Sequence, residues 1–78
     1  MKELENRKVM VMYFMEYAES YCEKNSYDIK IDEEFENMVL ICQDGITKAE
    51  LEGHFSYAET FKILKNGLIK MRTRWINK

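Results

Sequence analysis

Proline is absent from this sequence of 78 residues, and glycine occurs at only three isolated positions. The lack of proline excludes polyproline and collagen-like segments, and the isolated glycines exclude the Gly-rich loop that cradles phosphates in nucleotide-binding proteins. Apolar residues make up 46% of the chain and charged residues 33%, a balance that indicates a folded protein rather than a disordered one. We therefore expect residues 1–78 to form a single compact domain with a small core.

Residues that commonly carry chemistry are also scarce. The two cysteines, Cys22 and Cys42, are too few for a disulfide scaffold, and they have neither metal-ligand nor CxxC spacing. A zinc site requires about four ligands, and His54 is the only histidine. We therefore expect no enzyme activity, no catalytic residue, no metal and no cofactor, with both cysteines reduced and His54 in a loop or on the surface.

No long hydrophobic run is present. The longest, at residues 9–15, has seven residues, whereas a membrane-spanning helix needs about 20. The segment before it, MKELENRK, contains two glutamates and no small-residue cleavage site, which is atypical of a secretory signal peptide. We expect a cytoplasmic protein that does not associate with membranes.

Apolar residues recur at three- and four-residue steps over most of residues 3–24, which predicts a long first helix. The positions with this spacing are Leu4, Met10, Tyr13, Tyr17 and Tyr21. The run VMVMYFM at residues 9–15 is apolar at every position, so this part of the helix is hydrophobic around its whole circumference. One face of a small sheet cannot cover such a helix, and we expect part of it to remain exposed.

The middle of the chain predicts β-strands. Residues 27–32, YDIKID, alternate apolar and charged side chains, which is the pattern of a half-buried strand. The runs 38–43 and 46–52 flank Asp44-Gly45, and this dipeptide favours the type I′ turn of a hairpin because both central residues of that turn need positive φ. We therefore expect a β-hairpin that turns at Asp44-Gly45.

From Ser56 onward the pattern predicts a second helix. Ser56-x-x-Glu59 has the form of a capping box, and an apolar stripe follows at steps of three and four residues. The stripe consists of Phe61, Leu64, Leu68, Met71 and Trp75. Asn66-Gly67 would also suit a hairpin turn, but a glycine inside a helix costs only about 1 kcal/mol, so we favour the helix.

These elements predict an α+β fold of two layers, in the order α-β-β-β-α, with N- and C-terminal helices on a small antiparallel sheet. The alternative is an all-α, helix-turn-helix-like fold. In that fold Asp32 would cap a helix that ends at Gly45, and Thr47-x-x-Glu50 would begin the next one. The apolar face of the middle helix would then consist of Phe35, Met38, Val39 and Cys42. We prefer the α+β fold because the alternative does not explain the alternation at residues 27–32.

The surplus of methionine and aromatic residues in the first helix predicts a protein-binding surface, because these residues are enriched at interfaces. The candidate residues are Met12, Phe14 and Met15, together with the acidic residues Glu33, Glu34 and Glu36. We expect a small non-catalytic module that binds a protein partner or a second copy of itself, as an adaptor or inhibitor. By analogy, inhibitors of nucleic-acid-handling proteins encoded by phages and mobile elements are of this kind.

The uneven distribution of charge supports a different function. The net charge is −2, yet residues 1–61 hold fourteen acids and six bases, whereas residues 62–78 hold six bases and no acid. A basic strip on one side of the last helix could bind the phosphates of DNA or RNA. The candidate residues for such a regulator are Lys62, Lys65, Lys70, Arg72 and Arg74. Basic residues near a helix C-terminus are also favoured by the helix dipole alone.

Overall fold

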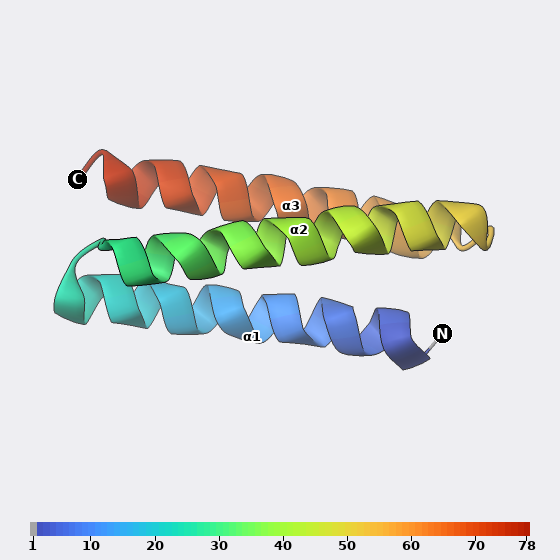
Figure 1. Ribbon diagram of the computed structural model, residues 1–78, viewed down its shortest axis with the longest axis horizontal. Coiled ribbons are helices and arrows are strands. Elements are labelled where there is room, and N and C mark those ends of the chain that lie inside the picture. Colours follow the sequence, from blue (N-terminus) through green and yellow to red (C-terminus); the bar gives the residue numbers. More distant parts are fainter. Residues whose placement is uncertain (1) are drawn as a thin grey trace.

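A computed structural model describes residues 2–78, which form three helices joined by two short turns. The middle helix runs antiparallel to the other two (Figure 1). They are α1 (Lys2–Asn25), α2 (Ile29–Leu51) and α3 (Phe55–Ile76). The bundle is elongated, with extents of 40 × 20 × 16 Å. The start of α1 lies at the same end as the α2–α3 turn, and the C-terminus lies at the other end beside the α1–α2 turn (Figure 1).

The predicted α+β fold is wrong, because no strand occurs among residues 2–78, and the all-α class of the alternative is confirmed. The helix-turn-helix-like details of that alternative are wrong, since Asp28 rather than Asp32 caps α2, and α2 continues past Gly45 and Thr47 to Leu51. The alternation at residues 27–32 spans the turn and the first residues of α2. The Asp28 side chain caps α2 by accepting a hydrogen bond from the Ile31 backbone N–H at 3.0 Å. Ile31 then points into the core, whereas Ile29 remains 73% exposed, so the two isoleucines do not share a buried strand face.

The predicted hairpin turn at Asp44-Gly45 is also wrong, because α2 continues through both residues. Its core positions follow a helical period and consist of Ile31, Phe35, Cys42, Gly45, Ile46 and Ala49. Gly45 is used for close packing rather than for a turn, since a Cβ atom there would lie 2.9 Å from the Phe61 ring. The reversal of the chain comes later, at Gly53, which has the positive φ of 76°.

The α2–α3 turn has the hydrogen bonds of a Schellman motif. The Gly53 N–H donates to the Glu50 carbonyl at 3.2 Å, and the His54 N–H donates to the Ala49 carbonyl at 2.7 Å. The next helix begins at Phe55, with His54 at the N-cap position and no side-chain capping bond. The predicted Ser56-x-x-Glu59 capping box is therefore wrong, because Ser56 already lies within the first turn of α3.

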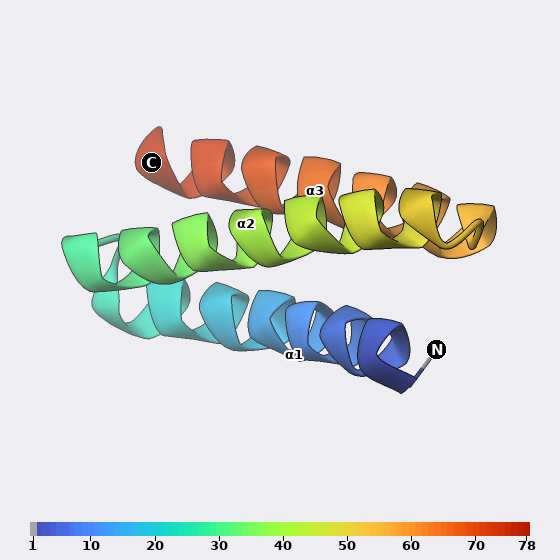
Figure 2. The same cartoon turned by 45° about the vertical axis from the view of Figure 1, so that its right-hand side comes forward.

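The two terminal helices were predicted correctly. The first was expected at residues 3–24 and spans Lys2–Asn25; the last remains helical through Asn66-Gly67. Figure 2, a view turned by 45°, shows the three helices running side by side along their length. The core lies between the three helices, and its largest fully buried side chains are those of Phe35, Phe61, Leu4, Ile31 and Leu68.

Candidate protein-binding surface

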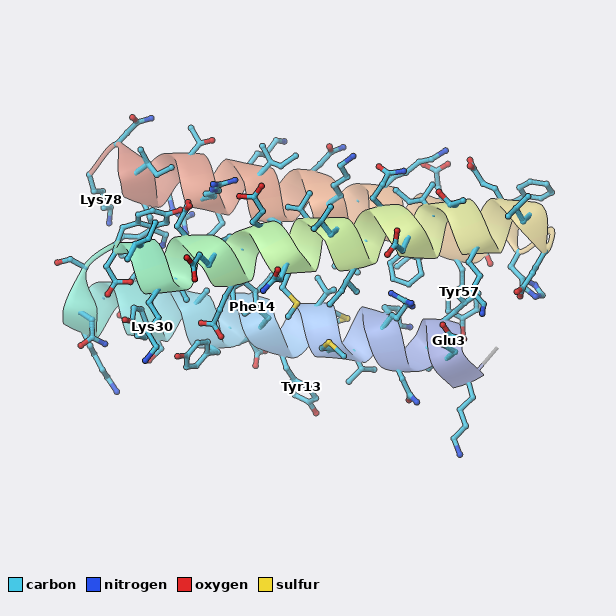
Figure 3. The ribbon with its side chains drawn as sticks, in the orientation of Figure 1. Glu3, Tyr13, Phe14, Lys30, Tyr57 and Lys78 are labelled. Atoms are coloured by element: carbon cyan, nitrogen blue, oxygen red, sulfur yellow. The ribbon has the colours of Figure 1, made fainter. Side chains whose placement is uncertain are left out.

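The outer side of α1 carries a cluster of exposed apolar side chains, which we call the α1 face. It consists of Val9, Met10, Met12, Tyr13 and Tyr17. Tyr13 is the most exposed of the five, at 69%, and it lies near their centre. Figure 3 shows Tyr13 pointing away from the bundle, whereas the neighbouring Phe14 points toward α2.

The α1 face exists because only a narrow stripe of α1 meets the other two helices. That stripe consists of Leu4, Val11, Phe14, Ala18 and Cys22. In the apolar run 9–15 only Val11 and Phe14 are buried, and Met15 is half-buried. A helix that is apolar around its circumference has apolar side chains left over when one side is packed. The leftover side chains form the α1 face.

The three apolar residues predicted for a binding surface are divided between the core and the exterior. Met12 is 50% exposed and belongs to the α1 face. Phe14 is 7% exposed and packs edge-on against Phe35, with ring centroids 5.1 Å apart and planes at 86°. Met15 packs against the core near Gly67. Phe14 and Met15 therefore stabilise the bundle, and Met12 alone remains available to a partner.

Sequence reasoning missed most of the α1 face because it treated Met10, Tyr13 and Tyr17 as the regular stripe of the helix. The signal that could have corrected this is the position of the small residues. Ala18 and Cys22 lie on the same side as Val11 and Phe14, and small side chains suit close contact between helices. The large tyrosines lie on the opposite side, where no helix approaches.

A shallow groove continues the α1 face toward α2. It is lined mainly by apolar surface from Met10 and Ile41, with Arg7 and Glu3 at its edge. The Arg7 side chain bridges the two helices, since it lies 3.3 Å from a Glu3 oxygen and donates to the Ile41 carbonyl at 3.5 Å. The groove therefore extends the apolar surface beyond a single helix.

The predicted acidic residues lie on α2, and they do not share one surface. Glu36 approaches Arg72 of α3, at 3.7 Å between charged atoms. Glu34 lies on the other side of α2, near Tyr21 of α1, where it adds to the rise in the pKa of Tyr21 that the hydrogen bond to Asp28 mainly causes. Glu33 points to solvent. These three residues do not form a continuous acidic patch with the α1 face.

The basic residues of α3 are mostly paired with the other two helices. Lys62 lies 3.4 Å from Glu50, and Arg72 lies 2.7 Å from Asp32. Arg74 lies 2.6 Å from Glu19. Lys65 donates a hydrogen bond of 2.6 Å to the Gln43 side chain. Among the five predicted phosphate-binding residues, only Lys70 has no such interhelical partner within residues 2–78.

The best-buried of these ion pairs is part of a cluster at the end of the bundle that holds the C-terminus. Asp32 accepts hydrogen bonds from the Tyr27 hydroxyl and from Arg72. The Tyr27 hydrogen bond and then the Arg72 guanidinium hold the pKa of the Asp32 carboxyl below its usual value of 3.8. Burial and the neighbouring Asp32 raise the pKa of Tyr27. The cluster joins the α1–α2 turn to both α2 and α3.

The groups that could perform chemistry are dispersed or buried. Cys22 and Cys42 lie in the core, and burial raises the pKa of the Cys42 thiol to about 11. His54 is half-buried at the start of α3, with its Nε2 atom 3.6 Å from a Glu52 oxygen. Residues 2–78 contain no group of three or more histidine, cysteine and acidic side chains placed to hold a metal ion.

Within residues 2–78, none of the helices has the length and apolar content that crossing a membrane requires. Comparison of the chain with models of known protein families, with curated protein sequences and with solved structures finds no match. The α1 face, defined by its own geometry, is therefore the strongest candidate for a functional site.

Proposed function

We propose that the protein is a small non-catalytic protein-binding module, an adaptor or inhibitor, which binds its partner through the α1 face. The observation that carries this proposal is the clustering of five exposed apolar side chains on one side of one helix. Contiguous apolar surface of this kind is typical of protein interfaces, and methionine and tyrosine are enriched there.

The other exposed apolar residues do not form a comparable cluster. Ile29, Leu51, Phe55 and Ile76 lie at helix ends or beside the turns, and Leu40, Ile63 and Ile69 are spread over the outer sides of α2 and α3. Single exposed apolar residues are normal on protein surfaces. The α1 face differs because its five members lie within nine residues of one helix, with Glu16 as the only charged residue among them.

Nucleic-acid binding is the weaker alternative, because four of the five candidate basic residues already have interhelical partners. A phosphate would have to compete with Asp32 for Arg72 and with Glu19 for Arg74. Fluorescence anisotropy with labelled DNA and RNA tests this alternative directly. Affinity that falls steeply as salt rises, and that Lys70→Glu weakens, would favour nucleic-acid binding over our proposal.

Photo-cross-linking in the cells that naturally express the protein tests the proposal. The photoreactive residue p-benzoylphenylalanine would replace Tyr13, in the centre of the α1 face. The matched control is the same replacement at Phe55, which is also aromatic and is 70% exposed. We expect a discrete cross-linked protein from position 13 and little product from position 55. Equal products from both positions, or none from position 13, would contradict the proposal.

A further inference from the structure

We infer that the partner of the α1 face is a second copy of this chain, bound about a two-fold axis that passes close to Tyr13. This inference rests on the proposed function and specifies the partner of the same surface. Its evidence is the symmetry of the α1 face, the extent of its apolar area and the placement of charge around it.

Two members of the α1 face flank Tyr13 symmetrically along the helix. Val9 lies one helical turn before Tyr13, and Tyr17 lies one turn after it. An antiparallel copy of α1 centred at Tyr13 would therefore set Tyr17 against Val9 of the partner, and Val9 against Tyr17 of the partner. A two-fold interface needs such a self-complementary patch, in which residue i meets residue j and j meets i.

The exposed area of the α1 face supplies more than half of what a standard interface buries on one partner. The five residues are between 37% and 69% exposed, which corresponds to about 500 Å² of accessible surface, most of it apolar. A specific interface of standard size buries about 800 Å² on each partner. The groove along Met10 and Ile41 and the polar rim of α1 supply further contact area of the kind that surrounds an apolar centre.

One charged residue, the exposed Glu16, lies within the α1 face, and the other charges on this side of α1 lie at its edges. Between Val9 and Met15 no residue is charged, and the nearest lysines on the exposed side of α1 are Lys2 and Lys24, eleven residues before and after Tyr13. Helices that cross at about 50°, the commonest packing class, diverge from the contact point, so these lysines would be separated from those of the other copy. A mainly apolar centre is more characteristic of dimers of identical chains than of transient complexes.

Sedimentation equilibrium of the purified protein between about 1 µM and 1 mM tests the inference. We expect a reversible dimer of twice the 9.4 kDa chain mass. Tyr13→Glu should weaken the dimer at least about 100-fold, since a charge would be buried at the axis. The matched control is Ile63→Glu, which also replaces a side chain about two-thirds exposed, but on α3, and should leave the dimer unchanged. Circular dichroism would verify that both variants fold.

A second variant tests the symmetry. In Tyr13→Cys the introduced thiols of two copies would face each other at the axis, and mild oxidation should link them. The native cysteines do not interfere because both are buried. Ile63→Cys should give no linked dimer under the same conditions.

The outcomes separate this inference from the proposed function. A protein that remains at 9.4 kDa throughout overturns the inference, and the proposed function then stands only if Tyr13 cross-links to a different protein in cells. A dimer that Ile63→Glu disrupts and Tyr13→Glu does not would overturn both, because the contact would then lie outside the α1 face. A Tyr13-dependent dimer in which Tyr13→Cys does not link would overturn the two-fold axis at Tyr13.

Discussion

The edge of the Phe61 ring occupies the space that a side chain at Gly45 would need. A Cβ atom at Gly45 would lie 2.9 Å from Cε2 of Phe61 and 3.0 Å from its Cδ2 and Cζ atoms. Phe61 is fully buried, so its ring has no free space into which it could move. This contact brings α2 and α3 close together in the half of the bundle that holds the α2–α3 turn.

Gly45→Ala should therefore destabilise the protein, despite the better helix propensity of alanine. Overpacking of a core costs about 1–3 kcal/mol, and removing a glycine from a helix gains about 1 kcal/mol. We expect the free energy of unfolding in urea to fall by on the order of 1 kcal/mol. Gly67→Ala is the matched control, because its Cβ atom would meet only the flexible end of Met15, at 3.1 Å. It should be neutral or stabilising; a stabilised Gly45→Ala would contradict the packing described.

The Asp32 cluster predicts a loss of stability in acid. Because the pKa of Asp32 is lowered in the folded protein, its carboxylate stabilises the fold above the unfolded pKa, and this contribution is lost as pH falls through the folded pKa. Asp32→Asn should therefore lower the unfolding free energy at pH 7, and its effect should become smaller as the pH is lowered. Urea denaturation over a series of pH values measures the difference. Glu33→Gln, on an exposed acid without an ion pair, is the control and should change stability little at any of these pH values.

The cysteines should be unreactive until the protein unfolds. Burial raises the pKa of Cys42 to about 11 and also raises that of Cys22, so at pH 8 only about one Cys42 thiol in a thousand would be the reactive thiolate. We expect Ellman's reagent to label both residues promptly in denaturant and very slowly in the native state. Rapid, stoichiometric labelling of the native protein would show that the core is open to solvent.

The two neighbouring aromatics at the middle of α1 should respond very differently to truncation. Phe14→Ala removes a core ring that packs on Phe35, and such changes cost about 3–5 kcal/mol, a large fraction of the stability of a small domain. Tyr13→Ala removes an exposed ring and should change monomer stability by less than about 0.5 kcal/mol. Thermal unfolding at low protein concentration measures both. Similar losses in the two variants would indicate that α1 is rotated from the orientation described.

The extent of α1 and α3 could be predicted from sequence because both carry apolar residues at helical spacing over about four to five turns. The middle of the chain could not. The alternation of residues 27–32 and the Asp44-Gly45 pair are genuine local preferences for strand and hairpin, yet both were overridden. The contact of Gly45 with Phe61 depends on a residue outside the Asp44-Gly45 pattern. The capping bond from Asp28 to Ile31 lies within residues 27–32, where the alternation was interpreted as a strand and the helix cap was missed.

The candidate site was predictable only in part for a related reason. The apolar run at residues 9–15 by itself determined that α1 has more apolar surface than one side can bury, because every position on its circumference is apolar. Which side would be left exposed was decided by the tertiary structure. The bundle placed the small residues Ala18 and Cys22 against its neighbours and left Tyr13 outside.

The charges of the basic C-terminal segment were likewise predictable from sequence, whereas their partners were not. The sequence by itself determined that residues 62–78 are cationic and that the preceding chain is acidic. Only the tertiary structure decided how those charges are used, by laying α3 antiparallel to α2 so that Lys62 meets Glu50 and Arg72 meets Asp32. Ion pairs between distant residues depend on the register of two helices, and that register is set by the fit of their buried side chains.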